Sequence, residues 1–465
     1  MDKFIADLRR NNSLRMEAGL LNVYRLKGTT DMSQMIVSTP LVATAASLRS
    51  GQLDLLTLVD EVCQRVDAHE PHIHALVPEP DRRTRLLREA TALQERFPDP
   101  VSRSPLYGIL LGVKDIFNAE GFPTHAGSQL PPELFRGAEA SCVTKLRDAG
   151  ALLLGKTITT EFAYFEPGPT RNPYNLEHTP GGSSSGSAAA VAAGFCPLAL
   201  GTQTIGSTIR PAAFCGIVGF KPSYGRISTD GLILCSASID TIGFFTQDVA
   251  SIALVAPLLC NDWRSAAADM MPILGVPDGP YLDQASPEGR AAFEKQVKLL
   301  EQAGYRVRRV EAMHDIDAIA LRHRRIVAAE MAQVHSTWFA MYETLYRPRT
   351  AALIREGQEV RPEELAADRA GRAGLRSELE GLMAQYGIDL WISPAAPGPA
   401  PEGITSTGDP AMNLPWTHSG LPAIALPAGR AANGLPLGLQ VVGAFMADEQ
   451  LVAWAQPMAE VLAHI

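Results

Sequence analysis

The stretch that decides the fold runs over residues 180–223 and reads PGGSSSGSAAAVAAGFCPLALGTQTIGSTIRPAAFCGIVGFKPS. Its density of glycine, serine and alanine would also suit a flexible linker. Apolar residues nevertheless recur through it, namely Val191, Phe195, Leu198, Leu200, Ile205 and Ile209. A linker has no need of such residues, whereas small residues between them allow backbones to pack closely. We therefore predict that the segment is packed, with an alanine-rich helix over 187–194 and a short strand over 197–201.

Outside this segment the chain alternates between helix-like and strand-like patterns. Apolar residues at helical spacing predict helices over 41–49, 53–68, 80–97, 141–149 and 458–462, and mainly helical structure over 285–310 and 318–386. Short apolar runs predict strands over 105–113, 151–154, 389–393, 423–426 and 437–442. This alternation predicts a layered α/β fold.

The chain of 465 residues shows no repeat and no clear linker. We expect an N-terminal extension over 1–39, made of short amphipathic helices. One large domain is expected over 40–465, with a helical excursion around 250–385.

Composition and charge narrow the class of protein. The formal net charge is −9 and no basic block occurs, so a nucleic-acid partner is not expected. The N-terminus mixes acids, arginines and apolar residues, unlike a secretory signal, and no run approaches the roughly 20 apolar residues of a membrane-spanning helix. These features predict a cytoplasmic protein without a membrane partner. The six scattered cysteines form no C-x-x-C pair and are expected to be reduced and mostly buried.

Histidines gather in one place only, at His69, His72 and His74, with Glu70 among them. Pro71 interrupts this stretch, and a proline opposes a regular helix that would hold all three on one face. We interpret them as loop histidines and expect no metal site.

Three polar elements carry the candidate chemistry. They are Gly112-Val113-Lys114-Asp115, the glycine-serine stretch over 181–187, and the stretch over 201–211 that contains Ser207. A serine hydroxyl is a weak nucleophile and needs a base to remove its proton. These elements contain no histidine, but Lys114 follows a short apolar run. Burial there would lower the lysine pKa and allow the neutral amine to act as base. Ser183 could then pass the proton, because a hydroxyl donates and accepts together.

The order and spacing of these elements resemble the amidase signature family, and the resemblance extends over most of residues 40–460. It includes the 24 positions that separate Ser183 from Ser207. The resemblance implies a large mixed central β-sheet with helices on both faces. It also implies Lys114 as base, Ser183 as proton relay after a cis peptide bond, and Ser207 as nucleophile. The implied oxyanion hole consists of the backbone N–H groups of Thr204, Ile205, Gly206 and Ser207.

The implied function is hydrolysis of the C–N bond of a small amide through an acyl-enzyme intermediate. No metal or organic cofactor is implied, and the expected partner is a small-molecule substrate, with the protein a monomer or homodimer. Family members also cleave carbamates and esters, so a carbamate or ester hydrolase is the near alternative. The amidase subunit of a tRNA-dependent amidotransferase and a catalytically idle scaffold are further alternatives. The altered 203–205 segment argues against the former, and retention of all three catalytic residues argues against the latter.

The chain departs from the common family pattern around the nucleophile. Gln203 stands where many members have aspartate, and Ile205 stands where they have glycine. Arg210 comes three residues after Ser207, where two is common. This variant resembles the malonamidase-like branch, whose corresponding arginine is associated with a substrate carboxylate. Arg210 is therefore either a substrate anchor or a structural arginine paired with a local acid or carbonyl.

Other side chains are candidates for the walls of the site. Tyr164, Phe165 and Ser184 are expected to bind substrate, and Phe122 flanks the site in the family. Core packing is the alternative for the aromatic residues. Cys215 is a rival nucleophile, but its apolar neighbours favour a buried residue without a catalytic role.

Overall fold

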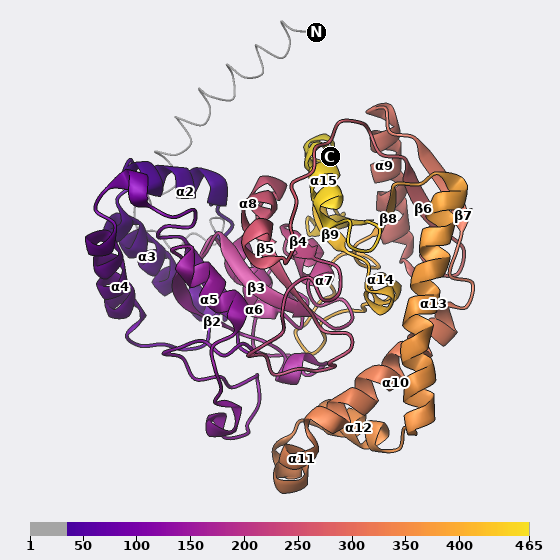
Figure 1. Cartoon of the computed structure of the whole chain (residues 1–465), viewed down its shortest axis with the longest axis horizontal. Helices are drawn as coiled ribbons and strands as arrows, with labels where there is room; N and C mark the ends of the chain where they lie inside the picture. Colours follow the sequence, from indigo (N-terminus) through magenta and orange to yellow (C-terminus); the bar gives the residue numbers. More distant parts are fainter. Residues whose placement is uncertain (1–34, 465) are drawn as a thin grey trace, which may run out of the picture.

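The computed structural model describes residues 35–464, so almost all of the extension predicted over 1–39 lies outside the described residues. A ten-stranded mixed sheet forms the centre of the molecule (Figure 1). Its strands are β1 (Leu110–Lys114), β2 (Leu152–Thr157), β3 (Leu198–Gln203), β4 (Val218–Lys221), β5 (Thr241–Thr246), β6 (Leu274–Asp278), β7 (Val307–Glu311), β8 (Leu390–Pro394), β9 (Ala423–Arg430) and β10 (Pro436–Val442).

The sheet is parallel at its two ends and antiparallel in the middle. The strand order is β2-β1-β3-β5-β4-β9-β10-β8-β6-β7. Strand β1 pairs in parallel with β2 and β3, and β6 pairs in parallel with β7 and β8. The pairs from β3 through β5, β4, β9 and β10 to β8 are antiparallel.

Fourteen α-helices surround this sheet within the described residues. They are α2 (Leu41–Ser50), α3 (Leu55–Ile73), α4 (Arg82–Arg96), α5 (Ser141–Asp148), α6 (Ser185–Ala192), α7 (Ile209–Phe214), α8 (Val249–Leu259), α9 (Pro287–Gln302), α10 (Ile316–Val334), α11 (Ser336–Tyr342), α12 (Pro348–Gln358), α13 (Pro362–Tyr386), α14 (Leu414–Ser419) and α15 (Asp448–Leu462). The indigo helices α2–α4 lie at one end of the molecule, and α10–α13 lie at the other (Figure 1). The predicted α/β fold, with a mixed central sheet covered by helices, is confirmed. Among the described residues no helix is long and apolar enough to cross a membrane.

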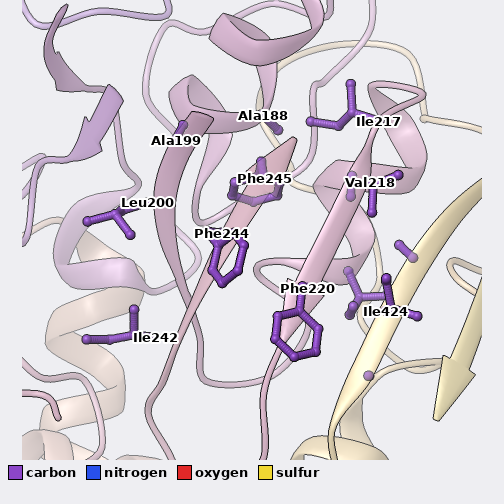
Figure 2. Packing of buried hydrophobic residues seen from close by; sticks show 14 of the residues in the cluster. Ala188, Ala199, Leu200, Ile217, Val218, Phe220, Ile242, Phe244, Phe245 and Ile424 are labelled. Carbon is purple, nitrogen blue, oxygen red and sulfur yellow. The ribbon is translucent and has the colours of Figure 1, made fainter. Parts of the chain in front are cut away.

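The segment over 180–223 is packed as predicted. Every residue in it is buried except Ile205 and Gly216, which are half-buried. A Cβ atom on Gly201 would lie 2.7 Å from the Phe245 ring, closer than atoms in contact approach. Figure 2 shows the adjacent core, in which the rings of Phe220 and Phe244 meet edge to face with centroids 5.6 Å apart. Small residues therefore let the segment approach a tightly filled core.

The prediction of loop histidines around Pro71 is wrong. Helix α3 continues through Pro71 to Ile73 and ends at His74, whose φ is 53°. The proline removes one backbone donor in the last turn, but Ile73 is fully buried and packing of the apolar face maintains the helix. His69 is buried, whereas His72 and His74 are exposed.

Several strands had no clear sequence signal. Strand β5 reads TIGFFT and is buried throughout, so it lacks the alternation of a half-exposed strand. Strands β6 and β7 lie within 250–385, where a helical excursion was predicted, and β7 ends the sheet. The closing helix α15 begins at Asp448, ten residues before the predicted start, and passes through Pro457.

Candidate active site

Two neighbouring parallel strands bring the candidate residues together. Strand β1 ends at Lys114, and β3 ends at Gln203 before a turn leads to Ser207 and α7. The register pairs Val113 with Leu200, so both strands end at the same edge of the sheet. Ligand sites in α/β sheets commonly lie beyond the carboxyl ends of parallel strands.

The glycine-serine loop is attached to β3 by its own hydroxyl groups. The Ser184 Oγ donates to the Thr202 carbonyl at 3.2 Å, and the Ser187 Oγ donates to the Leu200 carbonyl at 2.8 Å. The Gly182–Ser183 peptide bond is cis, in keeping with the resemblance. These contacts hold Ser183 beside the end of β1.

Lys114 is fully buried and its amine contacts two hydroxyl groups. The Nζ atom lies 2.7 Å from Ser183 Oγ and 2.7 Å from Thr202 Oγ1. Burial lowers the pKa of Lys114 to about 7, although Asp240 acts in the opposite direction. A substantial fraction of neutral amine is therefore present near neutral pH, which a lysine base requires.

The second buried lysine of this region has a different environment. Lys156 lies 2.8 Å from the Asp115 carboxylate and also donates to the Phe117 carbonyl at 2.7 Å. Burial lowers the pKa of Lys156, and Asp115 counteracts this by stabilising the ammonium. Lys156 is thus suited to hold Asp115 and the loop after β1, whereas Lys114 faces hydroxyl groups.

Ser207 and Ser183 line one narrow pocket with Thr204 and Ile205. Ser207 retains 6% of its surface exposed, and no hydrogen bond joins the two serine hydroxyls within residues 35–464. None of the backbone N–H groups of residues 204–207 donates to an acceptor in that part of the chain. The turn therefore offers several free donors next to a hydroxyl, as an oxyanion hole requires.

Gln203 accepts from the backbone donors that directly follow this turn. Its Oε1 atom accepts from the N–H groups of Thr208 and Ile209 at 2.8 and 2.9 Å, and its Nε2 atom donates to Thr417 at 2.9 Å. The side chain thereby satisfies the two donors that follow the turn and leaves those within it. Gly206 is required at its position, because a Cβ there would lie 2.4 Å from the Asn413 Oδ1.

Thr204 is held in the turn by two distant residues. Its hydroxyl donates to Asp240 at 2.6 Å, and its carbonyl lies 3.0 Å from His323 Nε2 on α10. Burial raises the pKa of Asp240 to about 6 and lowers that of His323 to about 3. A neutral His323 donates from Nε2, and its Nδ1 then accepts from His418 at 3.3 Å.

Arg210 lines the same pocket and has no carboxylate partner within hydrogen-bond distance among the described residues. It is 1% exposed and donates to the Gly182 carbonyl at 2.8 Å and to Thr407 Oγ1 at 3.1 Å. Its Nε and Nη1 atoms are buried without a partner. Burial lowers the pKa of Arg210 to about 10, and Asp409 partly offsets this. The guanidinium therefore has donors left for an anion.

The remaining sequence candidates separate into two groups. Tyr164 and Phe165 line the pocket, with their rings 4.8 Å apart. Ser184 is fully buried against β3 and is not part of the pocket lining. Phe122 lies below the Arg85 guanidinium at 4.7 Å and lines a different cavity. Cys215 is also buried, its pKa is raised by burial, and its thiol faces the Pro180 carbonyl at 3.4 Å.

Sequence reasoning assigned no individual role to Thr202, Asp240, His323 or Thr407. Thr202 lies inside a motif and could have been found from its place two residues before the turn. Asp240 follows a serine-containing stretch and His323 stands among arginines, so neither residue belongs to a pattern that indicates a role at the site. No group of three or more His, Cys, Asp or Glu side chains in the described structure is arranged to hold a metal ion.

Comparison with known proteins agrees with this architecture. The amidase family model matches residues 57–452. An amidase crystal structure superimposes with a TM-score of 0.83 at 32% identity, covering 91% of this chain and all of that one. The native peptide amidase from Stenotrophomonas maltophilia gives a TM-score of 0.78 at 27% identity, covering 92% and 97%.

Curated relatives are similar to this chain over comparable lengths. The A subunit of the glutamyl-tRNA(Gln) amidotransferase of Syntrophus aciditrophicus (strain SB) is 30% identical, covering 87% of this chain and 93% of its own length. That of Roseiflexus castenholzii (strain DSM 13941 / HLO8) is 31% identical, covering 87% and 92%. The chain belongs to the amidase signature family of enzymes.

Proposed function

We propose that this enzyme hydrolyses the C–N bond of a small amide with Ser207, Ser183 and Lys114. The observation that carries the proposal is the environment of the Lys114 amine, which is buried and lies 2.7 Å from the Ser183 hydroxyl. Ser183 and Ser207 line one pocket, and the adjoining turn has free backbone N–H groups.

In the proposed reaction the Ser207 Oγ attacks the amide carbonyl. The Ser207 proton passes to Ser183, and the Ser183 proton passes to the neutral Lys114 amine. The carbonyl oxygen becomes negative and accepts hydrogen bonds from the N–H groups of the turn. When the C–N bond breaks, the proton returns through Ser183 to the leaving nitrogen. Water then attacks the acyl-enzyme by the same route and releases the acid.

Arg210 supports a substrate that carries a carboxylate. The guanidinium lines the pocket and has two buried nitrogen atoms without partners. An unpaired buried charge is costly, and a carboxylate would accept a charge-assisted hydrogen bond from one of these nitrogen atoms. We therefore propose that the natural amide has a carboxylate, as in the malonamidase-like branch that the sequence resembles. The contact with the Gly182 carbonyl gives Arg210 a structural role as well.

Carbamates and esters form a similar tetrahedral intermediate and remain the near alternative. A panel of matched aryl amides, aryl carbamates and aryl esters, each with and without a carboxylate, separates these activities. The proposal requires measurable amide hydrolysis, with kcat/KM higher for the carboxylated amide than for its neutral counterpart.

The amidotransferase relatives favour one further candidate, an A-type subunit that hydrolyses glutamine for a partner. Its test is glutamine hydrolysis with and without tRNA, together with recovery of a stable partner from cells. Stimulation by tRNA through such a partner would support this second function over hydrolysis by the isolated chain.

Covalent labelling tests the assignment of the nucleophile. A fluorophosphonate probe is expected to modify the wild type and the exposed control Ser102→Ala, but not Ser207→Ala. Ser183→Ala and Lys114→Ala are expected to label far more slowly. Full amide hydrolysis by folded Ser207→Ala would overturn the proposal, and an unlabelled, inactive wild type would favour an idle scaffold.

A further inference from the structure

A second cavity of about 220 Å³ adjoins the pocket that contains Ser207. Helix α10 contributes one wall, with Ala320, His323 and Val327, and Leu353 of α12 contributes another. These two helices lie side by side in the lower right of Figure 1.

The two cavities share part of their lining. Tyr164, Phe165 and Ile205 belong to both. The two cavities therefore adjoin one another at these three side chains. Ile205 is the residue that replaces the common glycine in the turn, so its side chain supplies an apolar surface that a glycine would lack.

The larger cavity offers few polar partners. Arg324 at its edge is held by Glu356 through hydrogen bonds of 2.8 and 2.6 Å. Both ring nitrogens of His323 are engaged, with the Thr204 carbonyl and with His418. The remaining lining is aliphatic or aromatic, apart from the Tyr164 hydroxyl. Burying a polar group without a partner is costly, so this lining favours an apolar occupant.

The walls are connected by hydrogen bonds in the present conformation. The Glu161 carboxylate accepts from the Arg347 N–H at the start of α12, and Glu166 accepts from the Arg349 N–H at 2.6 Å. The Arg349 guanidinium also donates to the Phe165 carbonyl at 2.9 Å. The segment that contains Tyr164 and Phe165 and helix α12 are thus held together by hydrogen bonds within the protein.

We propose that this cavity binds an apolar alkyl or aryl group of the amide substrate. The proposal rests on amide hydrolysis as the activity and adds a class of substrate to it. The volume suits a group of phenyl size, because an apolar cavity of about 150 Å³ can hold benzene.

Filling the cavity from α10 tests the proposal. Ala320→Phe places a ring in the lining, and Ala318→Phe makes the same change at an exposed position of the same helix. Two substrate series are compared with acetamide: amides of ω-phenyl acids, with the ring on the acyl side, and N-(phenylalkyl)acetamides, with the ring on the amine side. Ala320→Phe is expected to raise KM about tenfold or more for one series, given the value of a methylene in a hydrophobic pocket. Acetamide hydrolysis by Ala320→Phe is expected to change much less than hydrolysis of the affected series. The Ala318→Phe variant is expected to match the wild type on all of these substrates.

The affected series shows whether the apolar group belongs to the acyl or the amine side. Equal loss for acetamide and both phenyl series, or no loss for any, would overturn the proposal. Val327→Ala enlarges the cavity and is expected to shift the preference toward a longer or bulkier group. An unchanged preference in that variant would also count against it.

Direct binding separates this proposal from the activity on which it rests. In the Ser207→Ala background, calorimetry with 4-phenylbutyramide and N-(2-phenylethyl)acetamide is expected to detect binding of at least one, weakened by Ala320→Phe. Such binding without any amide hydrolysis by the wild type would mean that the proposed activity is wrong, whereas the proposed role of the cavity in binding apolar groups is right. Hydrolysis of acetamide without binding of either phenyl compound would mean that the proposed activity is right and the proposed role of the cavity is wrong.

Discussion

The amine of Lys114 and the hydroxyl of Ser183 lie 2.7 Å apart, although 69 positions separate them in sequence. Two elements create this contact. Lys114 is the last residue of β1, and the loop before α6, which contains Ser183, is attached to β3 by serine hydroxyls. The relationship matters because burial lowers the pKa of this amine to about 7.

The pH dependence of kcat/KM is the first prediction. The neutral amine is the proposed active form. We therefore expect kcat/KM to rise with pH through an apparent pKa near 7 and to decrease as the pH is lowered further below 7. Lys114→Met is expected to lose about 100- to 10,000-fold in kcat/KM, the usual contribution of a general base. A rate that stays constant from pH 5 to 9 in the wild type would contradict this assignment.

The second prediction concerns stability at the neighbouring buried lysine. Lys156→Met leaves the Asp115 carboxylate buried without its 2.8 Å partner, so the free energy of unfolding is expected to fall by about 3–5 kcal/mol. Urea denaturation measures this loss. The double variant Lys156→Met/Asp115→Leu removes both charges and is expected to recover part of it. A loss below about 1 kcal/mol in the single variant would show that the pair behaves like an exposed one.

The third prediction concerns the charge in the pocket. Arg210→Met removes the guanidinium, and KM for a carboxylated amide is expected to rise about 10- to 100-fold, as hydrogen bonds to a charged group allow. The neutral amide of equal length serves as the internal comparison and is expected to change much less. Arg136→Met, at an exposed position, is the control variant. Equal losses on both amides would assign Arg210 to holding the Gly182 carbonyl instead.

The fourth prediction concerns His323, which donates to the Thr204 carbonyl at 3.0 Å. His323→Phe keeps a ring but leaves that carbonyl unpaired, so kcat is expected to fall about 5- to 100-fold through a distorted turn. KM is expected to change little, and His323→Gln, which can donate again, is expected to restore part of kcat.

The pH profile distinguishes this positioning role from catalysis by the imidazole. Burial lowers the pKa of His323 to about 3. Removal of the imidazole is therefore expected to leave the rise of kcat/KM near pH 7 unchanged. Loss of this rise in His323→Phe would mean that His323 is itself the titrating group.

Local patterns in the sequence predicted much of this fold, and they supplied the three residues proposed to be catalytic. Helices α2 and α5 were found from the helical spacing of their apolar residues, and strands β8 and β10 from short apolar runs. Strands β5 and β7 were not predicted, and the packing that maintains α3 through Pro71 is tertiary.

The sequence by itself determined that Lys114, Ser183 and Ser207 belong together, since each stands in a motif whose order and spacing carry the information. Only the tertiary structure decided what surrounds them. It brought Asp240 and His323 to Thr204, left two Arg210 nitrogens unpaired, and turned Ser184 away into the sheet. The physical reason is that burial and hydrogen-bond partners are set by contacts between distant segments, and a local motif contains no record of those contacts.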